Sequence, residues 1–452
     1  MTKRGRAPSE ASKQTGQKSD LQRILRVRDG LAVTVGIVIG AGILRTPGLI
    51  AGYVGNAGAM LGMWVLGGVV VALSTLVLAE MAAALPEAGG KYVYAREAWG
   101  HPVGFVAGWS EILVTRAFSG AAKAVVIAEY LVLLTGRGSV RILAAGVVIA
   151  FFFLHTRGLR AGRGFQNTST LAKVLVLAAI GAAGVFVGDG RGFRESMEVA
   201  PEYAGLLGFV LAYQAVAFAY YGWEDAAKMA EETQNPGRNL PRILVGGAAT
   251  VACLYLLINV AFLSALTPAE MAGSPLVAAD VLRSTFGSAA GTVVTVASLV
   301  ILASSLNVNF LGMPRVAFGL ARNRLAPAAF TRVGAGGTPG PALVFISVLI
   351  LALAVSGAFE LLIRFMMTIA ITVDLIVLAG IFRLRRKRPD LARPLKVPLY
   401  PWLPVVTVLL YAIVLAVIVG TQPVLALGAA VMLGSLWVAG WLVVRSTSST
   451  AE

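Results

Sequence analysis

Long apolar runs alternate with short polar segments over almost the whole chain. A run of roughly twenty apolar residues is long enough for a helix that crosses a lipid bilayer. Because twelve such runs follow one another, the pattern predicts an all-α integral membrane protein with twelve transmembrane helices. The runs lie near residues 28–53, 58–85, 102–134, 140–157, 165–188, 204–232, 241–266, 288–320, 340–357, 359–382, 402–420 and 424–444.

The composition and the placement of charge agree with a membrane protein. Hydrophobic residues make up 57% of the 452 positions and charged residues only 13%, compared with about 25% charged residues in soluble domains. The formal net charge of +16 does not indicate nucleic-acid binding, because Lys and Arg gather between the apolar runs. By the positive-inside rule we expect a multi-pass protein of the cell (inner) membrane with both termini in the cytoplasm.

Two of the predicted helices carry glycine near their middle. The first run contains Gly36, Gly40 and Gly42, and the sixth contains Gly222, followed by the polar pair at 224–225. One interpretation is close helix packing, which small residues allow. The other is a pair of discontinuous helices, because these two runs lie five helices apart, as in transporters built from two inverted repeats.

The second interpretation gives a domain organisation. Residues 25–445 form one membrane domain, with a first repeat at about 25–188, a second at about 204–382, and two added helices at about 402–444. Residues 1–24 are polar and lack the apolar segment of a signal peptide, so we expect a disordered cytoplasmic tail. A C-terminal tail follows at 446–452, and the outer segment 189–203 is expected to cap the domain.

Interrupting a helix inside the membrane frees backbone groups that can bind a ligand. Freed N–H groups at the start of a half-helix favour an anion, and freed carbonyl groups at its end favour a cation. A zwitterionic amino acid carries both charges, so two broken helices can hold it without a charged side chain. Glycine suits this role because a side chain would block close approach.

Four motifs, in order along the chain, resemble those of the amino acid–polyamine–organocation superfamily. GIVIGAGILRTPGLI (36–50) is similar to the first-helix motif of that superfamily. FAYYGW (218–223) and EETQNPGRNLPR (231–242) resemble its sixth-helix motif and following loop, especially in the bacterial L-type amino acid transporter-like branch. AEMAAALPEAGGKYVYAREAWG (79–100) resembles the end of its second helix and the reentrant loop that follows, and RPDLARPLKVPLYPWLP (388–404) resembles the loop before its helix eleven. The resemblance implies a LeuT-type core of 5+5 inverted repeats, with helices 1 and 6 broken, plus helices 11–12.

The same resemblance implies a substrate site between the two broken helices. N–H groups of the first break would hold the substrate carboxylate, carbonyl groups of both breaks would hold its amine, and Phe218 would cover the substrate from outside. The N–H donors would come from Ala41, Gly42 and Ile43, and the carbonyl acceptors from Val38, Phe218, Ala219 and Tyr221. Gly40 and Gly222 complete the expected substrate-binding set.

Two further residues bear on substrate specificity and on ion coupling, namely Tyr221 and Lys173. Tyr221 stands where the family motif often has a small residue, so its ring either shrinks the pocket and favours small substrates or points away into the core. Lys173 lies where sodium-coupled relatives coordinate a cation, and its ammonium would replace that ion. The alternative for Lys173 is snorkelling toward the inner interface.

Further polar residues within the runs are candidates for the pocket or its gates, because charge inside a membrane span is costly. Lys123 pairs with Glu224 or Asp225 if its role is structural, and Lys228 pairs with an acid three or four positions earlier. Asn307 and Asn309 either reach the site or form interhelical hydrogen bonds. The set of possible pocket or gate residues is Lys123, Trp223, Glu224, Asn307 and Asn309, and Glu80 and the loop 87–92 belong to the expected cytoplasmic gate.

These expectations define a function class. The sequence shows no phosphate-binding loop, no nucleophile–base pair and no metal cluster, so we expect no enzyme, no cofactor and no metal. We expect a sodium-independent permease that works by alternating access, as an antiporter or with proton coupling, on small neutral amino acids. A cationic amino acid or polyamine transporter and a non-transporting amino acid sensor are the alternatives. We expect no nucleic-acid partner. A disulfide-linked heavy chain is not expected either, because the single cysteine, Cys253, lies within a span.

Overall fold

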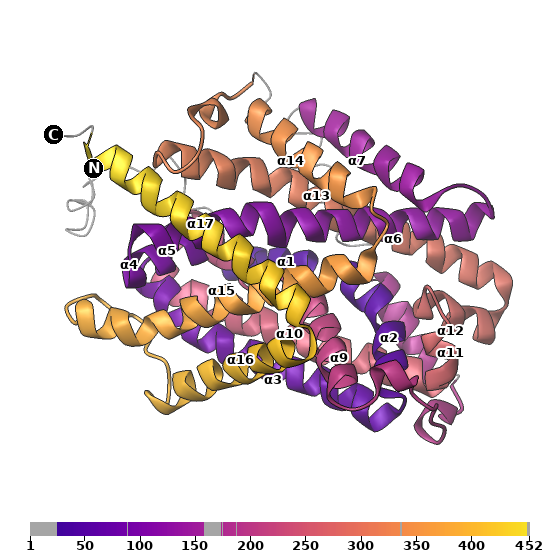
Figure 1. The fold of residues 1–452 in the computed structure, drawn as a ribbon. Coiled ribbons are helices and arrows are strands. Elements are labelled where there is room, and N and C mark those ends of the chain that lie inside the picture. Colours follow the sequence, from indigo (N-terminus) through magenta and orange to yellow (C-terminus); the bar gives the residue numbers. More distant parts are fainter. Residues whose placement is uncertain are drawn as a thin grey trace, which may run out of the picture.

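The computed structural model describes residues 25–87, 89–157, 173, 175–186, 188–334 and 337–449, so the tail predicted for residues 1–24 lies outside the described residues. The described residues fold into helices (Figure 1). Their only β-type pairings are three isolated bridges, Leu25 with Thr233, Asn56 with Ser196, and Val333 with Pro339. The predicted all-α membrane fold is therefore confirmed at this level.

Seven helices in the described part of the chain are long and apolar enough to cross a membrane, by length and composition. They are α3 (Ala57–Ala84), the continuous helix His101–Thr135, α10 (Pro236–Ala265), α13 (Ser288–Arg322), α15 (Phe359–Lys387), α16 (Trp402–Thr421) and α17 (Pro423–Ser449). The bent pair α1 (Val27–Val38) and α2 (Ala41–Val54) gives an eighth if it is one span. Shorter apolar helices are α7 (Val140–Thr156), Leu175–Phe186, α9 (Leu206–Tyr220) and α14 (Gly340–Ala354).

The helix His101–Thr135 is not uniform. It consists of α5 (His101–Ser110), a π-helical segment (Glu111–Arg116) and α6 (Ala117–Thr135). A π-helical segment widens the turn and re-aims the side chains that it carries, and such segments are frequent at functional sites. Here the segment begins and ends with a charged residue, and both charges are buried.

Both predicted helix interruptions are present. Between α1 and α2 the chain bends by 44°. Gly40, at this bend, has a non-helical backbone conformation with φ −167° and ψ −143°. After α9 the chain becomes extended at Tyr221, and Gly222 has a φ of +106°, which only glycine adopts without strain. The stretch Asp225–Glu232 then continues as a 3-10 helix rather than an α-helix.

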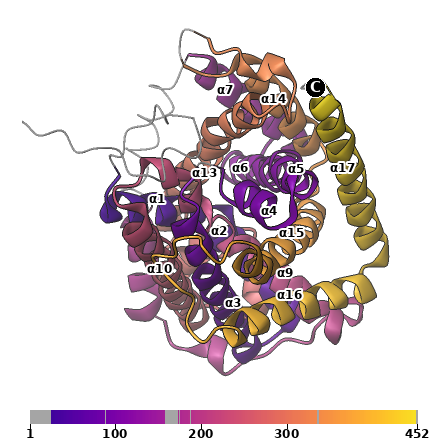
Figure 2. The ribbon, with the colours of Figure 1, turned by 90° about the vertical axis from the view of Figure 1, so that its left-hand side faces the viewer.

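The half-helices α2 and α9 lie in the interior of the bundle, and the last two helices lie at its edge. Figures 1 and 2 show α16 and α17 running along the outside, whereas α6, α2 and α9 lie further in. α2 packs along α9, and α1 packs along α10. This arrangement brings the two breaks, which are about 180 residues apart in sequence, next to each other.

Short segments close the end of the bundle where α2 stops. The segment 189–203 contains two short 3-10 turns, Arg191–Phe193 and Pro201–Tyr203. The N–H of Met197 donates a hydrogen bond to the carbonyl of Gly55 at 2.8 Å, which fastens this segment to the end of α2. Two more short helices follow α10, namely α11 (Pro268–Ala272) and α12 (Val277–Phe286). The last helix, α17, continues to Ser449, past the predicted start of the C-terminal tail.

Candidate functional site

The two breaks touch each other directly. A Cβ atom added to Gly42 would lie 2.3 Å from the Cα atom of Ala219, so only glycine fits at position 42. Ala41 and Ile43 beside it are buried. No side chain among the described residues caps the start of α2 at Gly40. The first N–H groups of α2 have no acceptor within the helix, and this end of α2 lies close to the second break.

Tyr255 of α10 joins the two breaks through its hydroxyl group. This hydroxyl lies 3.0 Å from the carbonyl oxygen of Val38 and 3.2 Å from that of Ala219. Both carbonyls belong to the set expected to hold the substrate amine. The carbonyl of Phe218 also has a donor, the N–H of Tyr221 at 3.1 Å. Sequence reasoning missed Tyr255, although a tyrosine in the middle of the run 241–266 was a signal that could have found it.

Lys173 lies against the end of the first half-helix. Its ammonium donates hydrogen bonds to the carbonyl oxygens of Gly36 at 2.8 Å and Ile39 at 3.3 Å. The side chain is 0% exposed. The geometry therefore does not fit snorkelling, because the charge is held at the break and does not reach the interface.

Phe218, near the end of α9, packs against α15. It is buried and makes an edge-to-face contact with Phe359 of α15, with 6.0 Å between ring centres. The guanidinium of Arg45 lies 5.6 Å from the centre of the Phe359 ring and pairs with Glu129 of α6 at 3.2 Å. Three helices thus hold the aromatic residue expected to cover the substrate.

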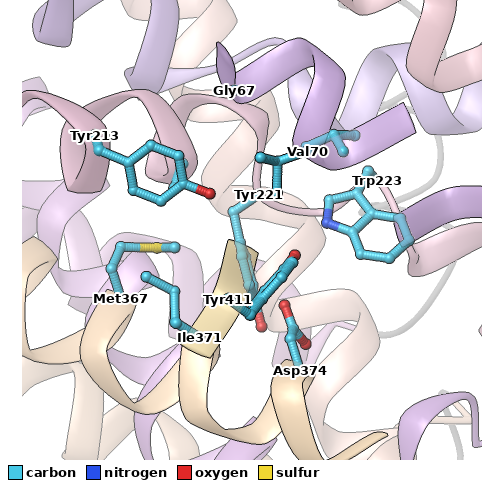
Figure 3. A pocket seen from close by; sticks show the side chains of 11 residues that line it. Gly67, Val70, Tyr213, Tyr221, Trp223, Met367, Ile371, Asp374 and Tyr411 are labelled. Carbon is cyan, nitrogen blue, oxygen red and sulfur yellow. The ribbon is translucent and has the colours of Figure 1, made fainter. Parts of the chain in front are cut away.

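The Tyr221 ring lines a pocket and does not only fill core space. The side chain shares this pocket with Asp374, Tyr411 and Trp223 (Figure 3). The described residues that line this pocket come from α3, from the region of the second break, and from α15 and α16, and none belongs to α1 or α2. The preference for small neutral amino acids stays a prediction.

A cluster of charged residues, buried except for the half-buried Lys228, lies beside the second break. It comprises Lys91 of α4 (Lys91–Trp99), Glu111 and Arg116 of the π-helical segment, Glu224, Asp225 and Lys228 that follow Gly222, and Asp374 of α15. We call these seven residues the charged cluster. Burying charge is tolerated when the charges are paired, and the cluster links three helical elements to the second break.

Two sets of ion pairs make up the charged cluster. The ammonium of Lys91 lies 2.9 Å from a carboxylate oxygen of Glu224 and 2.5 Å from one of Asp374. Burial alone would lower the pKa of Lys91, but these two carboxylates outweigh it and hold that pKa well above its usual value. The second set joins Arg116 to Glu111 and Asp225, and Lys228 to the same two carboxylates.

The ion pairs of the charged cluster can be compared with those predicted from the sequence. Lys228 lies 2.6 Å from Asp225, three positions earlier, so that pairing is confirmed. The pairing of Lys123 with Glu224 or Asp225 is wrong, because nearer cations from the π-helical segment and α4 occupy both carboxylates. Trp223 lies over the cluster, with its ring centre 5.9 Å from the Lys91 ammonium.

Lys123 instead reaches α13. Its ammonium lies 3.3 Å from the carbonyl oxygen of Ser305 and 3.2 Å from the side-chain oxygen of Asn309. Asn309 also donates to the carbonyl of Arg116 at 2.8 Å. Asn307 points elsewhere and lies 2.9 Å from the ring nitrogen of His155 in α7. Both asparagines thus form interhelical hydrogen bonds.

Glu80 ties α3 to the end of α15 and to the loop 388–404, where a cytoplasmic gate was expected. Its carboxylate accepts hydrogen bonds from Arg385 at 2.6 and 2.9 Å and from the N–H of Val397 at 2.7 Å, and Arg393 lies 3.4 Å away. The N–H of Leu25, just before α1, donates to the carbonyl of Glu232 at 2.9 Å. These contacts hold the segment before α1 to the end of the 3-10 helix 225–232, and α3 to the loop 388–404.

Comparison with known proteins agrees with this geometry. The family model described as amino acid permease matches residues 27–443. The b(0,+)-type amino acid transporter 1 of Mus musculus is 28% identical over 425 residues, which cover 88% of this chain and 84% of that protein. The serine/threonine exchanger SteT of Bacillus subtilis (strain 168) is 28% identical over 401 residues, covering 87% of this chain and 90% of SteT. The large neutral amino acids transporter small subunit 2 of Homo sapiens is 27% identical, covering 95% and 82%.

The apolar helices indicate a multi-pass membrane protein, and its two interrupted helices are in direct contact. The match extends over nearly the whole membrane domain. The chain belongs to the amino acid permease family, and the resemblance stated from its motifs is confirmed.

Proposed function

We propose that this protein is a secondary active transporter that exchanges amino acids across the cell membrane without sodium. The observation that carries the proposal is the contact between the two breaks, with the Lys173 ammonium on the carbonyl groups of the first. Membership of the amino acid permease family supports the same function. The SteT relative is named an exchanger, which favours exchange over uncoupled uptake.

The start of α2 supplies the site for the substrate carboxylate. Its N–H groups at Ala41, Gly42 and Ile43 lie at the positive end of a helix dipole, which favours an anion. Because Gly42 already touches Ala219, an amino acid enters this position only when the two breaks separate. We propose that this contact is a closed arrangement and that substrate binding is linked to movement of one broken helix relative to the other.

The carbonyl groups of Val38 and Ala219 supply the site for the substrate amine. In the closed arrangement both carbonyls lie within hydrogen-bond distance of the Tyr255 hydroxyl. An ammonium group carries three donors and forms stronger, charge-assisted hydrogen bonds. We propose that Tyr255 keeps the two carbonyls aligned when the substrate leaves and shares them with its amine when the substrate binds.

Lys173 replaces a coupling cation. An ammonium between the carbonyls of Gly36 and Ile39 satisfies the end of α1 with a fixed positive charge. A sodium ion at the same place would meet that charge at close range. The proposal therefore includes transport that does not depend on sodium.

The proposed topology has twelve membrane crossings. The eight long spans and the four shorter apolar helices each overlap one of the predicted runs. The loops that the positive-inside rule assigns to the cytoplasm include the Arg-rich segment 383–396, so both termini are proposed to be inside. We propose the cell membrane as the location. Cys253 lies in α10, which does not suit a disulfide to a heavy chain.

A counterflow assay in liposomes tests the proposed function. Purified protein is reconstituted with a high internal concentration of one unlabelled amino acid, and uptake of a labelled amino acid is followed over time. Each proteinogenic amino acid and the common polyamines are tested as the labelled compound. Time-dependent accumulation above empty liposomes is expected for at least one amino acid. Binding detected by a thermal shift without any accumulation would support a sensor and contradict the proposal.

A further inference from the structure

Lys123 of α6 carries a buried positive charge without a carboxylate partner. Its side chain is nine-tenths buried, with 9% exposed, and its two hydrogen-bond acceptors are the uncharged oxygens of Ser305 and Asn309, at 3.3 and 3.2 Å. Among the described residues, none of the ion pairs involves Lys123. A buried charge without a counter-ion is costly, so this residue needs another explanation than structural pairing.

The surrounding charges do not neutralise Lys123. The charged cluster contains the cations Lys91, Arg116 and Lys228 and the carboxylates of Glu111, Glu224, Asp225 and Asp374, which is an excess of one negative charge. Lys123 and Lys173 add two positive charges, and neither belongs to an ion pair in the described part of the chain. With both lysines protonated, the interior around the two breaks carries one unbalanced positive charge. A zwitterionic substrate leaves it unbalanced, whereas a substrate with a net negative charge removes it.

Lys123 is connected to the start of α2 through Ser305. A Cβ atom added to Gly40 would lie 2.4 Å from the hydroxyl oxygen of Ser305, so this side chain touches the first break. Ser305 is 1% exposed, and its hydroxyl has no hydrogen-bond partner among the described residues. A buried hydroxyl without a partner is rare in folded proteins. One unused polar group at the break and one unneutralised ammonium beside it form a site with two donors.

We propose that Lys123 and the Ser305 hydroxyl bind the side-chain carboxylate of an acidic amino acid, aspartate or glutamate. The inference rests on the proposed function, since it places the α-carboxylate of the same substrate on the N–H groups of α2. An ammonium has three protons, and two of them point to Ser305 and Asn309. The third proton and the Ser305 hydroxyl donate to the second carboxylate, and the charge of Lys123 is neutralised when the substrate is bound.

Pairs of substrates that differ only in charge give the sharpest test. In the counterflow assay, exchange of glutamate is compared with exchange of glutamine, and exchange of aspartate with that of asparagine. Hydrogen bonds to charged groups contribute enough to give a preference of at least about ten-fold in kcat/KM for the acid. Equal exchange of acid and amide, or a preference for the amide, overturns the inference while amino acid exchange itself stands. Failure to exchange any amino acid contradicts the proposed function instead, and this inference with it.

Substitutions then assign the preference to Lys123. Lys123→Met keeps the length of the side chain but removes its charge, and it is expected to lower the acid-to-amide ratio by at least about ten-fold. Lys123→Arg keeps the charge and is expected to keep acid favoured over amide. Lys387→Met makes the same chemical change at an exposed position at the end of α15 and serves as the matched control. An unchanged acid-to-amide ratio in Lys123→Met overturns the assignment of the preference to Lys123. If that variant does not fold, the acid-to-amide ratio of the wild-type protein decides the inference.

Discussion

The ammonium of Lys173 donates a hydrogen bond to the carbonyl oxygen of Gly36 at 2.8 Å, and it does so from a side chain that is 0% exposed. Gly36 belongs to the last turn of α1, just before the helix is interrupted at Gly40. The carbonyl groups at a helix end are unsatisfied and carry partial negative charge. Lys173 therefore completes the interrupted helix in the way that a bound cation would.

Replacing Lys173 by Met tests this role. Methionine fills a similar volume, but it leaves the carbonyls of Gly36 and Ile39 without their donor, at a cost of about 1–3 kcal/mol for each buried acceptor. We expect exchange to fall at least ten-fold, by the conversion of about 1.4 kcal/mol per factor of ten. Size-exclusion chromatography of the purified variant checks folding. Wild-type exchange rates in a folded Lys173→Met protein would show that the ammonium is not needed.

Tyr255→Phe removes the hydroxyl shared by the carbonyls of Val38 and Ala219. We expect slower counterflow and a lower thermal unfolding midpoint, because two buried acceptors lose a donor. Tyr220→Phe is the control, since the Tyr220 hydroxyl bonds to the carbonyl of Trp64 and not to a break. The control is expected to lose stability only. Equal losses of exchange in both variants would argue against a role of Tyr255 at the breaks.

The apolar runs and the glycines predicted much of the fold, for a physical reason. A helix in a membrane is encoded locally, by length and hydrophobicity, and a break is encoded by residues such as Gly222 that tolerate a positive φ. The contact of Lys173 with the first break was also predictable, because a resemblance placed it there. The apolar pattern did not predict the end of α17. This helix continues to Ser449 through polar residues, which an apolar run does not contain.

The charged cluster and the orientation of Tyr221 could not be predicted from local pattern. The partner of Asp225 is Arg116, more than a hundred positions earlier, and the partner of Lys91 is Asp374, at the far end of the chain. Tyr221 turns toward Lys91, whose ammonium lies 5.1 Å from its ring centre. Such contacts depend on how distant helices pack against each other, so a local sequence pattern does not encode them.

Lys91→Met tests the energetic weight of the charged cluster. The substitution leaves the carboxylates of Glu224 and Asp374 buried without the cation that pairs with both. Breaking a buried ion pair by removing one partner costs about 3–5 kcal/mol, so we expect a clearly lower thermal unfolding midpoint. Adding Asp374→Asn to the variant removes one of the two uncompensated charges and is expected to restore part of the loss. If the double variant is no more stable than the single one, the pairing does not carry this energy.

Gly42→Ala tests the contact between the breaks. The added Cβ atom would lie 2.3 Å from the Cα atom of Ala219, so the breaks cannot close in their present form. We expect loss of exchange. Gly62→Ala in α3 is the matched control, because an added Cβ atom there has no neighbour within 4 Å among the described residues. Normal exchange by a correctly folded Gly42→Ala protein would be incompatible with a substrate site at this contact.

The central claim is exchange of amino acids between two broken helices, with Lys173 in place of a coupling ion. Its most direct measurement is the counterflow rate of the wild-type protein with sodium in the buffer and with sodium fully replaced by choline. The account predicts the same rate and the same apparent KM in both buffers, because the ammonium already occupies the carbonyls of Gly36 and Ile39. A steep rise of the rate with sodium concentration would contradict it.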